Sequence, residues 1–253
     1  MHSDFQTSVS ALRNYTKPVI KFTSRNQPPR IVLALENSID MNSRDQWEYI
    51  RTACKKFILH DLPENAELGL VMFNTDAYIS HAVTRLGASM VSSVRNNLAF
   101  SINNKHNLSP KSGSCVRCAV DKSIEALTSR PSDAEAGIII LITRDNSGEL
   151  ASDVGMEATL IKDARKHNLQ IYPLLLQQTD FGVGYPMLER VAHETGASSF
   201  LLSSRMSNGG TASIYLDMID AFRVVQSATI PYSPQLVRFS FFCLAVREGK
   251  VEY

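Results

Sequence analysis

Three side chains that could bind a cation, Glu36, Ser38 and Asp40, directly follow an apolar run at residues 31–35. Carboxylate and hydroxyl oxygens are the ligands that Mg²⁺ and Ca²⁺ prefer. In a doubly wound α/β domain, ligands bind just beyond the carboxyl ends of the buried parallel strands. We therefore expect this segment to form the first part of a binding site.

Other polar residues occupy equivalent positions later in the chain. Ser114 precedes a helical pattern at residues 116–127, and Arg144 and Asp145 follow a continuous apolar run at residues 137–143. Apolar runs of this kind are typical of strands that are buried on both faces of a parallel sheet. The carboxyl ends of parallel strands meet at one edge, so these side chains are expected near the first segment.

The elements that would position them alternate along the chain. Strands alternating with helices favour an α/β fold, with three layers and a doubly wound, mostly parallel sheet flanked by helices. A tight connection before residues 77–83 predicts one antiparallel edge strand. We expect strands at residues 31–35, 68–73, 77–83, 137–143, 170–176 and 199–202, and helices at residues 43–60, 89–100, 116–127, 154–167, 186–194 and 212–225.

The domain organisation follows from the ends of this pattern. Residues 1–29 read as an irregular lead-in that ends in two prolines, residues 30–227 as the α/β domain, and residues 228–253 as a linker and the start of an incomplete β unit. The first residues lack the apolar stretch of a signal peptide. No run approaches the roughly 18 apolar residues of a membrane span, so we expect no membrane insertion.

The order of elements and the loops at the strand ends resemble a von Willebrand factor type A domain, and most closely that of the calcium-activated chloride channel regulator family. The supporting segments are residues 31–41, 68–74, 113–127, 138–146 and 185–196. The resemblance implies a non-catalytic, adhesion-type module that binds a protein partner or neighbouring domains of a longer chain. It also implies an extracellular or cell-surface location and a role in regulating chloride transport.

Type A domains carry a metal-ion-dependent adhesion site, in which hydroxyls and carboxylates of three loops hold the ion and a partner's acid completes its coordination. The resemblance places this site at the residues above, with substitutions. Glu36 replaces an Asp, Ser38 is retained, Asp40 replaces a hydroxyl, and Ser114 replaces a Thr. The resemblance therefore implies a site whose ligand set has changed.

The largest change is in the third loop, where Arg144 replaces an Asp and Asp145 is displaced by one residue. A guanidinium stays protonated at ordinary pH and repels a nearby divalent ion. We hypothesise that Arg144 pairs with Glu36 or Asp40 and takes the place of the lost cation. The expectation is a degenerate site that binds no metal or other cofactor, with Mg²⁺ or Ca²⁺ as the alternative.

An enzymatic alternative would use Ser38, Asp40 and Asp145 with a divalent ion. The sequence lacks the HExxH, GxSxG and P-loop motifs that would support a peptidase, hydrolase or nucleotide site. The net charge of +1 gives no indication of nucleic-acid binding. The CxxC pair Cys115 and Cys118 is expected to supply small core or helix-start residues, with a redox pair or a zinc site as alternatives.

Overall fold

The fold is built around a central strand, β1 (Arg30–Glu36), all seven residues of which are buried in the computed structural model. Two parallel strands flank it, β2 (Glu67–Phe73) and β4 (Gly137–Arg144). The structure describes residues 28–88, 92–129, 136–144, 155–176, 186–202 and 212–229. The predicted lead-in up to residue 27, Asp145 and the predicted β-rich tail from residue 230 lie outside these ranges.

The sheet has six strands in the order β3-β2-β1-β4-β5-β6. Strands β5 (Leu169–Leu176) and β6 (Phe200–Leu202) continue the parallel arrangement on one side of β1. On the other side, β3 (Ala77–Arg85) pairs antiparallel with β2, which confirms the predicted edge hairpin. The direction of strand order therefore changes between β1 and β4, where α/β sheets of this type bind their ligands.

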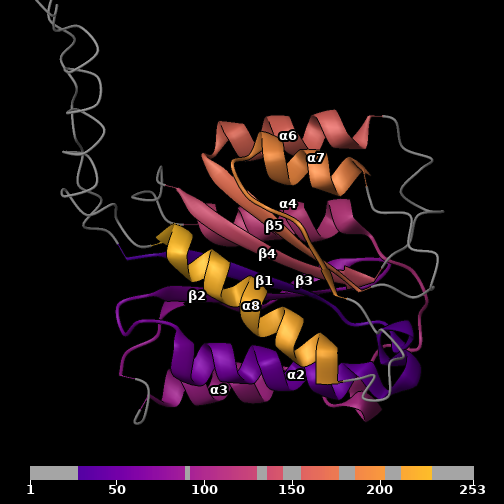
Figure 1. Ribbon diagram of the computed structural model, residues 1–253. Coiled ribbons are helices and arrows are strands. Elements are labelled where there is room, and N and C mark those ends of the chain that lie inside the picture. The colour runs from indigo at the N-terminus through magenta and orange to yellow at the C-terminus, as the bar shows by residue number, and fades with distance from the viewer. Residues whose placement is uncertain are drawn as a thin grey trace, which may run out of the picture. The chain divides into compact units, whose positions relative to one another are not determined.

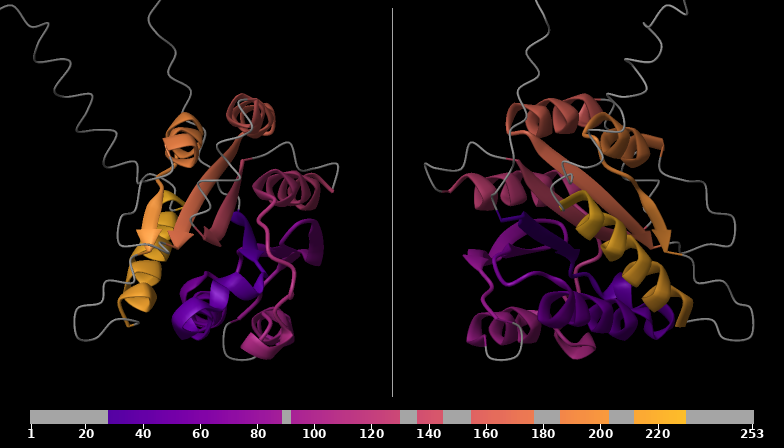
Figure 2. Two further views of the ribbon diagram at one scale, coloured as in Figure 1. Left: turned by 90° about the vertical axis from the view of Figure 1, so that its right-hand side faces the viewer. Right: turned by 60° about the vertical axis from the view of Figure 1, so that its left-hand side comes forward.

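Helices cover both faces of the sheet (Figure 1). Helices α2 (Gln46–Lys56), α3 (Ser93–Ser101) and α8 (Ala212–Thr229) lie against one face, and α4 (Val116–Thr128), α6 (Met156–Lys166) and α7 (Pro186–Glu194) against the other (Figure 2). Two separate clusters of buried apolar side chains fill the spaces between these layers. The predicted three-layer, doubly wound α/β architecture is confirmed.

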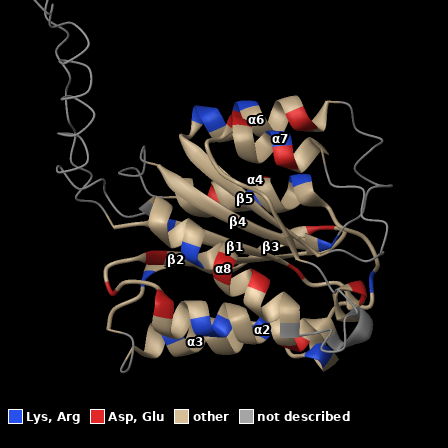
Figure 3. Cartoon of the chain, in the orientation of Figure 1, with Lys and Arg blue, Asp and Glu red and all other residues tan. Residues whose placement is uncertain are grey.

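Alternation along the strands explains why there are two clusters. Successive side chains of a strand point to opposite faces, so Leu33 and Leu35 belong to the cluster under α2 and α8, whereas Val32 and Ala34 belong to the cluster under α4. The Lys, Arg, Asp and Glu residues are concentrated on the helices and loops, while the strands are mostly uncharged (Figure 3). Among the described helices, we find none with the length and hydropathy of a bilayer-spanning segment.

Three predicted helix boundaries are wrong by several residues. The helix expected from residue 43 begins as an α-helix only at Gln46, because a 3₁₀ segment, η2 (Ile39–Asp45), precedes it. The helix expected from residue 89 begins after Ser92, whose hydroxyl accepts the Arg95 N–H and caps it. Helix α8 extends to Thr229 rather than residue 225, and the Gln226 amide anchors its last turns by donating to the Asp61 carbonyl.

Candidate functional site

The candidate site lies where β1 and β4 end side by side at the change in strand order. Leu35 pairs in parallel register with Ile142, and this register carries the next residues, Glu36 and Thr143, to the same edge of the sheet. The loop after β1 is held by backbone hydrogen bonds, from Asn37 N–H to the Phe73 carbonyl at 2.6 Å and from Ile39 N–H to the Ser109 carbonyl at 2.8 Å. Three loops that are distant in sequence therefore converge here.

Glu36 is the centre of the site and is fully buried. The Ser38 hydroxyl donates to its Oε1 at 2.6 Å, and the Thr143 hydroxyl donates to its Oε2 at 2.6 Å. The backbone N–H of Arg144 also donates to Oε2, at 3.1 Å. A buried carboxylate is tolerated only when its charge and its oxygens are compensated in this way.

The Arg144 guanidinium lies between two carboxylates. Its Nε is 2.9 Å from Glu36 Oε1, and its Nη1 is 2.7 Å from Asp40 Oδ2. Only 10% of the Arg144 side chain is exposed, so these ion pairs are largely shielded from solvent. Asp40 is partly exposed and also accepts a hydrogen bond from the Ser112 hydroxyl at 2.6 Å.

The second loop joins the site through Ser114. Its hydroxyl lies 2.9 Å from the Thr143 hydroxyl, which in turn donates to Glu36. The following N–H, that of Cys115, donates to the Asn74 carbonyl at 2.6 Å and ties the second loop to the end of β2. The result is a continuous polar network from Ser114 through Thr143 and Glu36 to Arg144.

The residues present do not fit a divalent metal ion in the manner of a metal-ion-dependent adhesion site. Both Glu36 oxygens are already bonded to donors, and a permanent positive charge contacts both Glu36 and Asp40. A second cation would have to approach that guanidinium and displace its ion pairs. Within the described ranges, no three side chains of the His, Cys, Asp and Glu types gather in a geometry that could hold a metal ion.

Of the residues that the sequence singled out, the structure places Glu36, Ser38, Asp40, Ser114 and Arg144 close together, and Asp145 lies outside the described residues. Sequence reasoning missed two residues, Thr143 and Ser112. Thr143 had a visible signal, since it is the polar residue at the carboxyl end of an otherwise apolar strand. Ser112 had no such signal, because nothing in the sequence distinguishes it from the other serines of the polar loops.

The cysteines require a correction. Cys115 and Cys118 form a disulfide, rather than serving only as small core or helix-start residues. The helix-start part of the expectation holds, because Cys115 is the N-cap of α4 and its sulfur accepts the Cys118 N–H. The first turn of a helix brings residues three apart onto the same side, so the two sulfur atoms can meet.

Gly113 allows the second loop to pack closely against the end of β2. Its φ of +129° is one that residues with a side chain rarely adopt, and an added Cβ would lie 2.7 Å from Thr75 Cγ2. We expect Gly113→Ala to lower the free energy of unfolding by about 1–3 kcal/mol, as measured by urea denaturation. Thr75→Ser removes the clashing methyl, so the double variant should recover part of this loss; no recovery would contradict the steric explanation.

Comparisons with known proteins support the fold. No protein-family model matches this sequence, and no curated protein matches it either. Among solved structures, a von Willebrand factor type A protein from Catenulispora acidiphila is similar, with a TM-score of 0.55, 12% identity, and coverage of 78% of this chain and 43% of that chain. The pilus adhesin SpaC from Lactobacillus rhamnosus GG has a TM-score of 0.55, 12% identity, and coverage of 79% and 31%.

The human COPII-coat protein Sec24c is similar as well, with a TM-score of 0.54, 16% identity, and coverage of 79% of this chain and 32% of that chain. This chain thus spans less than half the length of each of these three structures. At such low identity the likeness concerns the fold alone. The chain has the α/β fold of von Willebrand factor type A domains, and its polar network lies at the carboxyl ends of β1 and β4.

Proposed function

We propose that this chain is a non-catalytic protein-interaction module in which a guanidinium replaces the metal ion of an adhesion-type site. The observation that carries the proposal is the position of Arg144, in contact with both Glu36 and Asp40 at the switch point of the sheet. In a metal-ion-dependent adhesion site, a partner's acid binds the ion. Here the central charge is already neutralised, so recognition passes to the surrounding loops.

The exposed residues of those loops have a distinct character. Ile39 is 45% exposed beside the site, and Lys105, His106 and Lys111 are exposed in the loop between α3 and α4. Residues 101–114 contain basic residues and no acidic ones. This combination suits a partner that presents acidic side chains around an apolar contact. We define the binding surface as Ile39, Lys105, His106 and Lys111.

Other observations agree with an interaction module rather than an enzyme. Two proteins that share the fold are named as a pilus adhesin and a coat protein, which denote adhesion and assembly rather than catalysis. Of the residues in the enzymatic alternative, Ser38 donates its hydroxyl to Glu36 and Asp40 pairs with Arg144. Neither is placed as an activated nucleophile or base.

The resemblance to the calcium-activated chloride channel regulator family adds a finer proposal about origin. On that basis, the module belongs to an extracellular or cell-surface protein that regulates chloride transport, and its partner is another protein or a neighbouring domain. This part rests on the loop sequences alone, whereas the proposal of an interaction module rests on the fold and the polar network.

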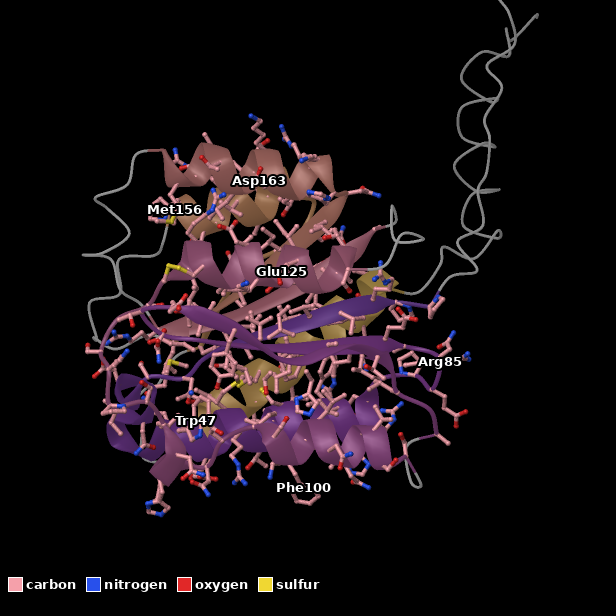
Figure 4. All side chains as sticks on the ribbon, turned by 180° about the vertical axis from the view of Figure 1, so that it is seen from behind. Trp47, Arg85, Phe100, Glu125, Met156 and Asp163 are labelled. Atoms are coloured by element: carbon pink, nitrogen blue, oxygen red, sulfur yellow. A yellow bond between two sulfur atoms is a disulfide. The ribbon has the colours of Figure 1, made fainter. Side chains whose placement is uncertain are left out.

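A charge-reversal comparison tests the binding surface. Wild-type chain and a Lys105→Glu/Lys111→Glu variant would be coupled to beads and exposed to extracellular proteins of the source tissue. Arg85→Glu provides the matched control, because Arg85 is exposed and pairs in register with Glu67, at the opposite end of the sheet (Figure 4). We expect the first variant alone to lose specific partners. Identical captured proteins for all three would contradict the assigned surface.

A further inference from the structure

The position of the Cys115–Cys118 disulfide is typical of a reactive cysteine pair rather than of a structural cross-link. The two cysteines are separated by three positions at the start of α4, and both are half-buried, so a reagent in solution can reach them. The Cys115 sulfur is the N-cap of this 13-residue helix and accepts the Cys118 N–H at 3.2 Å. The bond itself and its half-buried position at a helix N-terminus are separate observations.

The bond can contribute little to holding the fold together. A disulfide stabilises mainly by restricting the unfolded chain, and the effect shrinks as the closed loop becomes shorter. Here the loop contains only Val116 and Arg117. Val116 and Ala119, in the same turn, are already buried against the sheet, so apolar packing fixes this part of α4 without the cross-link.

The environment favours a thiolate on Cys115 when the bond is open. Helix N-termini carry a partial positive charge and unpaired N–H groups, which stabilise a negatively charged sulfur. The Cys118 N–H already points at the Cys115 sulfur. The remaining described cysteine, Cys54, is fully buried in α2, and burial raises the pKa of its thiol, so it serves as an unreactive internal reference.

We propose that Cys115 and Cys118 form a redox-active pair that undergoes thiol–disulfide exchange with a dithiol reductant. A thiolate of the reductant attacks the Cys118 sulfur, the bond between the two cysteines breaks, and Cys115 leaves as the stabilised thiolate. The second thiol of the reductant then attacks the mixed disulfide and releases Cys118. The reductant becomes a disulfide and transfers two electrons to the cysteine pair; Cys118 takes up one proton, and the other proton is released to solvent while Cys115 stays a thiolate.

The pair is adjacent to the polar network of the candidate site. Ser114 precedes Cys115, and its hydroxyl lies 2.9 Å from that of Thr143, which donates to Glu36. Opening the bond frees the Cys115 side chain while the Asn74 carbonyl still holds its N–H. Reduction of the Cys115–Cys118 bond should therefore change the environment of Ser114. Signals from residues of the polar network can then report whether exchange has occurred.

The test uses the intact folded chain treated with dithiothreitol and then labelled with iodoacetamide at neutral pH, with the labelled positions identified by mass spectrometry. We expect reduction without denaturant, labelling of Cys115 about tenfold faster than of Cys118, and no labelling of Cys54 until the chain unfolds. Cys118→Ser should retain the fast reaction and Cys115→Ser should lose it. The wild-type measurement stands even if a variant fails to fold.

Two results would overturn the proposal. A bond that stays oxidised in excess dithiothreitol until urea unfolds the chain would identify a structural cross-link. Equal labelling rates for Cys115 and Cys118 would refute the assignment of the stabilised thiolate. As a second readout, the amide NMR signals of Ser114 and Thr143 should shift on reduction, and unchanged signals would show that the pair is not coupled to the candidate site.

Discussion

Replacing Glu36 by glutamine is expected to lower the free energy of unfolding by about 3–5 kcal/mol. The carboxylate is fully buried and compensates most of the charge of Arg144, whose side chain is only 10% exposed. Glutamine keeps the shape but removes the negative charge and directs an N–H₂ group at the donors around it. The Arg144 guanidinium would then rely on Asp40 alone. Urea denaturation measures this loss of stability as a lower midpoint concentration, provided that the m-value of the variant equals that of wild type.

A double-mutant cycle separates this pairing from general disruption. If Glu36 and Arg144 compensate each other, Arg144→Met in the Glu36→Gln background should cost less than Arg144→Met alone, with a coupling energy of about 1–3 kcal/mol. Asp220→Asn is a suitable control, because the pair of Asp220 with Arg223 is more than 70% exposed on both sides and should contribute little. Additive effects at Glu36 and Arg144 would show that the ion pair is not the source of stability.

The second large effect is expected at Arg95, which is fully buried although it belongs to α3 at the outside of the fold. Its guanidinium donates to the carbonyls of Gly87, at 2.9 Å, Leu62, at 2.8 Å, Pro63, at 3.1 Å, and Ile58. It thereby ties the π-helical segment η3 (Phe57–Asp61) and the loops around it to α3. Burial lowers the pKa of Arg95, but a guanidinium still remains protonated.

We expect Arg95→Met to lower the free energy of unfolding by about 3–5 kcal/mol, since it leaves several buried carbonyl groups without their donor. Methionine fills much of the same space, so the loss would report hydrogen bonding rather than a cavity. Arg223→Met, at a side chain that is 72% exposed, is the matched control. A stability within 1 kcal/mol of wild type, by the usual scale of surface substitutions, would contradict this role for Arg95.

The sequence predicted the sheet well because buried parallel strands carry a strong signal. The continuous apolar stretches of β1 and β4 have few alternative structures, and their alternation with helical patterns required a parallel sheet. The same logic placed Glu36 and Arg144 at one edge, since both follow such strands. The general location of the candidate site therefore follows from the order of elements.

Features that depend on contacts between distant residues could not be predicted in this way. Arg95 occupies a helical position where a charged residue normally faces solvent, and only the loops that surround α3 explain its burial. The start of α2 was placed too early because a 3₁₀ segment and an α-helix share similar local preferences. The pairing of Cys115 with Cys118 depended on the sulfur atoms meeting across one turn, which spacing permits but does not require.

The resemblance added the expectation of a changed metal site, and we base the proposal that a guanidinium replaces the ion on the side chains at the end of β4. Arg144 is the last residue of β4, and the alternation of side chains along a strand directs Thr143 and Arg144 to opposite faces. Thr143 reaches Ser114 and Glu36 on the α4 side, and the Arg144 guanidinium bridges Glu36 and Asp40. The proposed replacement of the ion by a guanidinium therefore depends on the presence of Arg144 at the end of β4.

A positive control for cation binding can be built from the same position. Arg144→Asp removes the guanidinium and returns a carboxylate to the third loop, beside Glu36 and Asp40. We expect the melting temperature of this variant to rise with the concentration of Mg²⁺ or Mn²⁺. A ligand that binds only the folded state stabilises it by about 2.7 kcal/mol at one hundred times its Kd.

The most direct test is the same titration of the wild-type chain with Mg²⁺ and Mn²⁺, followed by thermal denaturation. If the Arg144 guanidinium occupies the place of the ion, the melting temperature of wild type should not change with either cation, and Ser38→Ala should behave in the same way at a lower starting stability. A saturable rise for wild type that Ser38→Ala abolishes would show that the loops hold a metal ion, and it would contradict the account.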